Sequence, residues 1–168
     1  AFPPARDFAG ENKGFAITRT YEKLGMDGAL SEANELKVGD MVVVTLGVEI
    51  SVGERYLAIN DSLPSVLEAI NPEFGTQNER DESRLPDGME AWFCDHREIH
   101  ADRALFFTDY APAKGRFGLR YLARVIAEGD VIAPPAKIEA MYEPEKYGLS
   151  ASQRIITLPG THGKVAGR

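Results

Sequence analysis

The feature that most constrains the fold is an alternating stretch at residues 115–125. Its apolar positions are Phe117, Leu119, Tyr121, Ala123 and Val125. Apart from Leu122, the positions between them and at the start of the stretch hold arginine or glycine, namely Arg116, Gly118, Arg120 and Arg124. Because successive side chains of a β-strand point to opposite faces, this period of two predicts a strand with one buried face.

The residues after this stretch predict a change of direction. We interpret Gly129 and Asp130 as a turn. Pro134 and Pro135 follow, and proline has no backbone N–H to contribute to a sheet. We therefore expect strand pairing to stop at this pair of prolines.

Residues 138–147 combine large apolar side chains with charged ones. Met141 and Tyr142 stand among glutamates and a lysine, and Pro144 is expected to break any regular element. We interpret the segment as a proline-stiffened loop whose apolar side chains press against a partner. That partner is either the domain's own core or another domain.

Six further segments have the apolar alternation or the β-branched content of strands. They are residues 15–24, 41–52, 55–59, 91–100, 103–110 and 152–158. Residues 41–52 are the most apolar and are expected to form a central strand, with residues 51–54 as a hairpin turn into the next strand.

About seven short strands without a convincing amphipathic helix are typical of an all-β, immunoglobulin-like antiparallel β-sandwich. We expect the sandwich to span residues 14–158, with a long charged loop at residues 76–90. Residues 1–13 are interpreted as a lead-in and residues 159–168 as a flexible C-terminal tail.

Composition narrows the classes of function. The net charge is −7 and no cluster of Lys and Arg occurs, which argues against nucleic acid and anionic membranes as partners. No run of eighteen apolar residues suggests direct membrane insertion. The single cysteine, Cys94, rules out an internal disulfide and is expected to be a small buried side chain. Since the first residue is Ala1, we expect a segment of a longer chain.

A metal site is one alternative that the residues themselves leave open. In a strand, His96, Glu98 and His100 would lie on one face, about 6.5–7 Å apart in steps of two residues, and these side chains can bind zinc. The other interpretation is a surface strand whose Glu98 pairs with a nearby arginine. Because the only other histidine, His162, falls in the expected tail, we expect neither a metal nor another cofactor.

Patterns typical of catalysis are also missing from the sequence. Gly-x-Ser-x-Gly does not occur, and no glycine-rich loop links a strand to a helix. No serine or cysteine stands in the sequence context of a known nucleophile. We therefore expect the chain not to be an enzyme.

Several motifs together carry a family resemblance. They are Tyr121-Leu122-Ala123-Arg124, Gly129, Pro134-Pro135-Ala136 and Met141-Tyr142-Glu143-Pro144-Glu145. With them, residues 14–157 resemble the C-terminal macroglobulin-like domain of bacterial alpha-2-macroglobulins. The sequence departs from the family pattern at Ser62, where proline is usual, and at Val66, where glycine is usual. Because valine does not adopt a positive φ cheaply, we expect this turn to be built differently.

The resemblance implies a non-catalytic domain of a protease-trapping inhibitor. In that family a protease cleaves a bait segment, the molecule rearranges, and a reactive thioester formed by Cys-x-x-Gln captures the protease. Cys94 is followed by Asp95, His96 and Arg97, so this chain does not form that thioester itself.

The implied partner is the thioester domain of the same parent chain, and proteases are reached through the parent. Met141 matches the family methionine that leans toward the thioester region, and the resemblance implies that Met141, Tyr142 and Pro144 make the interdomain contact. In the resting state this contact would shield the thioester from water.

The resemblance also implies a periplasmic or cell-envelope location within a larger anchored or secreted protein. The alternative is a free-standing β-sandwich that binds protein or carbohydrate. A long parent reading frame with an upstream Cys-x-x-Gln supports the first interpretation, and a short gene supports the second.

Overall fold

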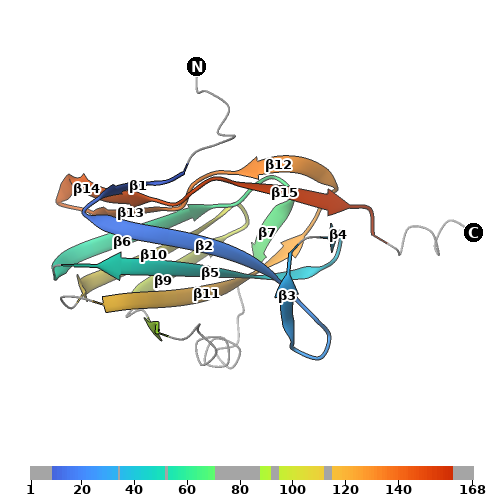
Figure 1. The fold of residues 1–168 in the computed structure, drawn as a ribbon, viewed down its shortest axis with the longest axis horizontal. Helices are drawn as coiled ribbons and strands as arrows, with labels where there is room; N and C mark the ends of the chain where they lie inside the picture. Colours follow the sequence, from blue (N-terminus) through green and yellow to red (C-terminus); the bar gives the residue numbers. More distant parts are fainter. Residues whose placement is uncertain are drawn as a thin grey trace, which may run out of the picture.

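A computed structural model describes residues 9–33, 35–51, 53–70, 88–91, 95–111 and 115–160. This part of the chain contains no helix, and it forms the strands β1 to β15 (Figure 1). The strands belong to two larger sheets and one small sheet. The predicted all-β class is therefore confirmed, with more strands than the seven expected, because many of the additional ones are only two to five residues long.

The first sheet has six strands. In spatial order they are β1 (Glu11–Lys13), β14 (Glu143–Leu149), β13 (Lys137–Ala140), β6 (Glu54–Ser62), β10 (Arg103–Ala111) and β9 (His96–His100). All its neighbouring strands are antiparallel. The β13–β14 hairpin therefore lies inside the sheet, between β1 and β6.

The second large sheet faces the first. Its order is β3 (Leu30–Glu32), β2 (Phe15–Leu24), β5 (Met41–Ile50), β11 (Gly115–Val125) and β7 (Leu67–Ile70), and β8 (Glu90–Ala91) pairs with β11 in parallel. A third sheet consists of β12 (Gly129–Ala133), β15 (Gln153–Leu158) and β4 (Leu36–Lys37). In Figure 1 this small sheet lies toward the end of the molecule opposite the β13–β14 hairpin.

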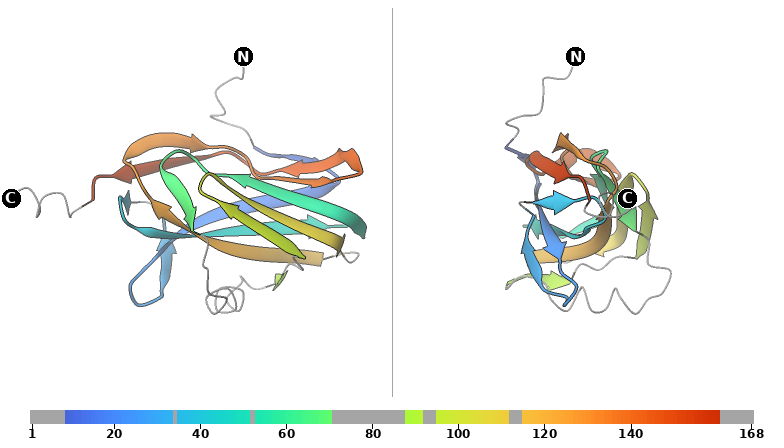
Figure 2. Two further views of the ribbon diagram at one scale, coloured as in Figure 1. Left: turned by 180° about the vertical axis from the view of Figure 1, so that it is seen from behind. Right: turned by 90° about the vertical axis from the view of Figure 1, so that its right-hand side faces the viewer.

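The buried apolar side chains of the two large sheets form one cluster, the core, and Figure 2 shows the arrangement of the sheets end on. Phe106, Ile59 and Ile138 from the first sheet are fully buried, and so is Leu46 from the second. Leu119 of β11 is 2% exposed. Burial of such apolar surface is the main stabilising contribution to a fold of this kind. The architecture is the predicted immunoglobulin-like β-sandwich.

Strand β11 confirms the alternating pattern but is covered on both faces. Its apolar positions face the core as predicted, yet Gly118, Arg120 and Leu122 on the other face are also buried. Arg120 Nε donates a hydrogen bond to Thr45 Oγ1 at 2.9 Å, which lets a charged side chain lie against the sheet. The predicted buried face is therefore present, but the opposite face of β11 is also buried over residues 118–122.

The predicted hairpin turn at residues 51–54 is wrong. Strand β5 pairs with β2 on one side and β11 on the other, so neither edge is free for β6. The chain instead crosses to the other sheet, where β6 pairs with β10 and β13. Sequence patterns show where a strand ends but not which sheet the next strand joins.

The predicted turn at Gly129 and Asp130 is also wrong, because both residues belong to β12 and pair with Thr157 and Ile156 of β15. The predicted end of pairing at Pro134 is confirmed, since β12 ends at Ala133. Regular structure begins earlier than expected, because β1 lies within the predicted lead-in.

The turn after Ser62 is built as expected, without a left-handed residue at Val66. Val66 is instead buried, and one of its methyl carbons would lie 3.2 Å from a Cβ placed at Gly129. Most of the predicted loop at residues 76–90, residues 161–168 of the predicted tail, Cys94 and His162 lie outside the described residues.

Candidate functional site

Met141 and Tyr142 form the turn of a β-hairpin rather than part of a loop. They join β13 to β14, and 51% of Met141 and 79% of Tyr142 is exposed to solvent. The predicted loop at residues 138–147 is therefore wrong, and the two side chains face solvent rather than the domain's own core. We call this pair the Met-Tyr turn.

Pro144 lies inside β14, contrary to the prediction that it breaks any regular element. The register explains why: Ala140 pairs with Glu143, and Glu139 pairs with Tyr147. Three residues of β14 therefore lie between two paired neighbours of β13, which makes a β-bulge. A bulge leaves its residues outside the ladder, so the missing N–H of Pro144 removes no hydrogen bond there.

Ion pairs join the turn end of the hairpin to β6. Lys146 Nζ lies 2.7 Å from Glu143 Oε2 on its own strand and 3.2 Å from Glu54 Oε2 on β6. The hydrogen bonds to Glu143 and then to Glu54 raise the pKa of Lys146, so this side chain stays charged at neutral pH. The pair is exposed, and its contribution is therefore screened by salt.

Close packing holds β14 against the opposite sheet. A Cβ atom at Gly148 would lie 2.3 Å from the carbonyl oxygen of Phe15. This separation is below any real contact of a carbon with an oxygen, so the position accepts only glycine unless the backbone moves. The hairpin therefore packs tightly against the opposite sheet at Gly148, whereas residues 141–146 at its turn end are exposed.

Tyr56 of β6 contacts the Met-Tyr turn and was not predicted as a site residue. The backbone N–H of Met141 donates a hydrogen bond to the carbonyl oxygen of Tyr56 at 2.8 Å. The rings of Tyr56 and Tyr142 meet edge to face, with centroids 5.1 Å apart and planes at 80°. Nothing in the sequence marks Tyr56, because this contact depends on how two distant strands pair.

A different group of polar residues lies between the two large sheets. Arg19 of β2 forms an ion pair with Asp61 of β6, and the hydroxyl of Tyr121 on β11 donates a hydrogen bond to the same carboxylate. All three residues are buried. We call them the buried triad; it joins the two sheets through polar contacts and was not predicted.

The electrostatics of the buried triad follow from the lack of solvent. Burial is the largest influence on Asp61 and raises its pKa, while Arg19 and the hydrogen bond from Tyr121 act in the opposite direction. Burial and the neighbouring Asp61 also raise the pKa of Tyr121 well above its ordinary range. Tyr121 therefore remains protonated and acts as a hydrogen-bond donor.

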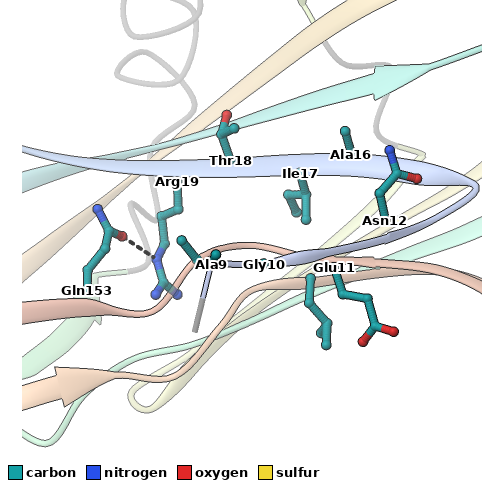
Figure 3. Close-up of a pocket in the computed structure, with 11 residues that line it drawn as sticks. Ala9, Gly10, Glu11, Asn12, Ala16, Ile17, Thr18, Arg19 and Gln153 are labelled. Atoms are coloured by element: carbon teal, nitrogen blue, oxygen red, sulfur yellow. Dashed lines mark hydrogen bonds between the residues drawn. The ribbon is translucent and has the colours of Figure 1, made fainter. Parts of the chain in front are cut away.

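One cavity reaches Arg19 from the surface (Figure 3). It has a volume of about 410 Å³ and is lined by residues that include Glu11, Arg19 and Gln153. Arg19 Nε donates to Gln153 Oε1 at 3.3 Å. Because Asp61 already offsets the charge of Arg19 and Glu11 is also part of the lining, the cavity offers little attraction to an anion.

The candidate metal residues lie together on the exposed face of β9. His96 Nε2 is 3.2 Å from Glu98 Oε1, and His100 Nε2 is 3.6 Å from Glu98 Oε2. The hydrogen bond with His96 is the main reason that the pKa of Glu98 is lowered; burial opposes the lowering, and the hydrogen bond with His100 adds to it. Glu98 thus pairs with histidines rather than with the expected arginine. Among the described residues, no group of three His, Cys, Asp or Glu side chains has a geometry that holds a metal ion.

The described residues include no helix of the length and apolar character needed to cross a membrane.

Comparisons with known proteins agree on one family. A family model described as the bacterial alpha-2-macroglobulin MG10 domain matches residues 14–145. An alpha-2-macroglobulin homolog of Nostoc sp. is 26% identical over 155 residues, which cover 88% of this chain and 8% of the relative. The alpha-2-macroglobulin of Escherichia coli is 28% identical over 142 residues, which cover 79% of this chain and 8% of the relative.

A solved structure shows the same fold. Trypsin-activated alpha-2-macroglobulin from Escherichia coli superimposes with a TM-score of 0.71 at 25% identity, covering 90% of this chain and 11% of that one. The chain thus spans about a tenth of the length of its relatives. The matched residues include β6, β13, the Met-Tyr turn and the first three residues of β14. The chain belongs to the family of MG10 domains of bacterial alpha-2-macroglobulins.

Proposed function

We propose that this chain is a non-catalytic docking domain of a protease-trapping alpha-2-macroglobulin. In the resting protein its Met-Tyr turn packs against the thioester domain of the same parent chain and keeps water away from the thioester. The observation that carries this proposal is the exposure of two large apolar side chains, Met141 and Tyr142, at the turn of the β13–β14 hairpin.

The family and the length of the relatives support a partner within the same chain. The relatives are alpha-2-macroglobulins in which the matching part is 8% of the length. A domain of that size has neighbours on the same polypeptide, and an exposed apolar turn is suited to contact one of them. Because the relatives are bacterial, we also propose a periplasmic or cell-envelope location.

The chemistry of the two side chains suits a removable cover. A thioester hydrolyses when water reaches its carbonyl carbon, so a resting trap needs an apolar surface over it. Methionine is flexible and polarisable and fits an irregular surface without polar demands. Tyr142 presents an apolar ring, and its hydroxyl can remain hydrated or bind a partner.

The hairpin lowers the entropic cost of docking. Pro144 has a fixed φ, and Lys146 joins its own strand to Glu54 of β6. A segment already held in its bound shape loses less conformational freedom when it docks. Pro144 therefore contributes to the contact through the shape of the hairpin.

The test uses the full-length parent protein and follows the release of the thioester thiol. Addition of methylamine converts the thioester into an amide, as the amine nitrogen bonds to the carbonyl carbon and the C–S bond breaks to release a cysteine thiol. The readout is the rate at which new thiol appears rather than the total amount of thiol, because Cys94 contributes a thiol that is present from the start. We expect Met141→Ala and Tyr142→Ala to increase this rate.

Tyr110→Ala is the matched control, because Tyr110 is 57% exposed and pairs with Arg55 near the same end of the sheet. We expect this variant to react at the rate of the unmodified parent. Unchanged rates for both Met141→Ala and Tyr142→Ala would contradict the proposal, and so would a parent chain that lacks Cys-x-x-Gln.

A further inference from the structure

We infer that Tyr56 is a positioning residue that holds the Met-Tyr turn in one orientation, ready to dock. This inference rests on the proposed function, because it concerns the same contact surface. Tyr56 belongs to a strand more than eighty positions earlier in the sequence, and no pattern links it to the turn.

The backbone of Tyr56 is the first observation. Its φ is 55°, and it is the one non-glycine residue of the described chain with a positive φ. An aromatic residue rarely adopts this conformation, and such strain persists only where surrounding contacts enforce it. The strain at Tyr56, beside the exposed turn that it contacts, indicates a functional role for this residue.

The pairing of β6 with β10 is interrupted at Tyr56. Between β6 and β10, Thr108 pairs with Leu57 and Tyr110 pairs with Arg55, but the pair between them, Tyr56 and Asp109, is skipped. The N–H of Asp109 instead donates to Asp95 Oδ2 at 2.6 Å. Tyr56 is therefore released from this ladder on the β10 side of its strand.

On the other side of β6, Tyr56 contacts the turn twice. Its carbonyl oxygen accepts the hydrogen bond from Met141 N–H at 2.8 Å, and its ring meets the ring of Tyr142 edge to face. The first contact fixes the backbone of the turn, and the second fixes the direction of the exposed ring. An edge-to-face pair of this kind has a preferred geometry.

The contact leaves the docking surface open. Tyr142 remains 79% exposed although its ring touches Tyr56, which is itself 42% exposed. The ring of Tyr56 thus supports one side of Tyr142 and leaves the rest available to a partner. We expect Tyr56 to increase the fraction of molecules in which Tyr142 already points in the docked direction.

Two substitutions separate the ring from the backbone. Tyr56→Gly removes the ring but retains the carbonyl oxygen and accepts a positive φ without strain. Tyr56→Phe retains the ring and removes only the hydroxyl. The control is again Tyr110→Ala, which removes an exposed tyrosine ring near the same end of the sheet.

The first measurement is NMR spectroscopy of this chain. In Tyr56→Gly we expect the Tyr142 ring resonances to shift toward those of a freely rotating tyrosine, while the Met141 amide stays protected from hydrogen exchange. Tyr56→Phe and Tyr110→Ala should retain the Tyr142 shifts of the unmodified chain. Unchanged Tyr142 shifts in Tyr56→Gly would overturn the positioning role.

The second measurement is the rate of thiol release in the full-length parent with methylamine. We expect Tyr56→Gly to increase the rate of thiol release about two- to tenfold. This factor corresponds to the interaction energy lost with one aromatic pair. Tyr56→Phe should react like the unmodified parent. The thermal midpoint of each variant is measured separately. A faster thiol release at an unchanged thermal midpoint then reports lost positioning rather than a general loss of stability.

The two proposals fail in different ways. If Tyr142→Ala accelerates thiol release and Tyr56→Gly does not, Tyr56 has no positioning role and the proposed function stands. If Tyr56→Gly moves the Tyr142 resonances but Tyr142→Ala leaves thiol release unchanged, Tyr56 positions the ring and the proposed function is contradicted.

Discussion

The buried triad and the Met-Tyr turn use tyrosine in opposite ways. At the triad, Tyr121 is buried and its hydroxyl donates a hydrogen bond to Asp61. At the turn, Tyr142 is exposed and its ring rests against another ring. The buried triad thus places polar groups in the interior, where apolar groups are expected. The Met-Tyr turn places apolar groups on the surface, where polar groups are expected.

This contrast separates residues that maintain the fold from residues that are available for binding. A buried charge is tolerated only with a partner, so Arg19 and Asp61 depend on each other, and Tyr121 supports the Asp61 carboxylate. An exposed apolar ring contributes little to the stability of its own domain, because it loses little solvent contact on folding. Substitutions should therefore affect stability at one place and docking at the other.

The largest effect on stability is expected for Asp61→Asn. This change leaves the charge of Arg19 buried without a counterion, and breaking a buried pair in this way destabilises a protein by about 3–5 kcal/mol. Urea denaturation of the chain measures the change in the free energy of unfolding. The double variant Arg19→Met with Asp61→Leu removes both charges and should recover most of the loss.

Asp130→Asn provides the matched exposed case, since Asp130 pairs with Arg154 at the surface. Its effect should be much smaller than that of Asp61→Asn. Equal destabilisation by the two substitutions would contradict the distinction between buried and exposed pairs.

A smaller effect is expected for Tyr121→Phe. The substitution keeps the ring and removes the hydrogen bond to the Asp61 carboxylate, and a hydrogen bond to a charged group contributes about 1.5–3 kcal/mol. Urea denaturation should show a lower midpoint with an unchanged slope. A stability equal to that of the unmodified chain would mean that water replaces the lost donor.

Tyr142→Ala removes only the ring pair with Tyr56, so the stability of the isolated chain should fall by no more than about 0.5–1.5 kcal/mol. Thiol release in the parent should nevertheless accelerate. A large loss of stability in the isolated chain would contradict the separation of fold and docking. The thermal midpoint and the thiol assay together decide between these outcomes.

The smallest effect is expected for Lys146→Met, which removes the ion pairs to Glu143 and Glu54 while retaining an unbranched side chain. We expect slightly faster hydrogen exchange at the Met141 amide and little change in overall stability, because the pair is exposed. Addition of 1 M NaCl to the unmodified chain should reproduce part of the effect. An effect independent of salt would indicate lost packing rather than lost charge.

Local patterns in the sequence predicted many of the strands. Strands β2, β10 and β15 begin and end at or within one residue of the predicted limits, because alternation depends only on which side chains face the core. The central position of β5 also followed from its apolar run. The family resemblance, which rests on the motifs between Tyr121 and Glu145, is confirmed by the match over residues 14–145.

Features that depend on distant contacts were missed. Pro144 was expected to end regular structure, but a bulge accommodates it. Asp61 falls beyond the predicted strand at residues 55–59, whereas it lies in β6 and contacts Arg19 and Tyr121. Tyr56 has no signal in the sequence, since its unusual φ and its contact with Tyr142 arise only when β6 lies beside the hairpin.

The position of β1 has a mechanical consequence. This three-residue strand joins its sheet through β14, with Glu11 opposite Leu149 and Lys13 opposite Tyr147. The same β14 leads to the Met-Tyr turn at its other end. Tension on the polypeptide ahead of Glu11 would therefore load the β1–β14 pairing in shear, and β14 connects that pairing directly to the projecting turn.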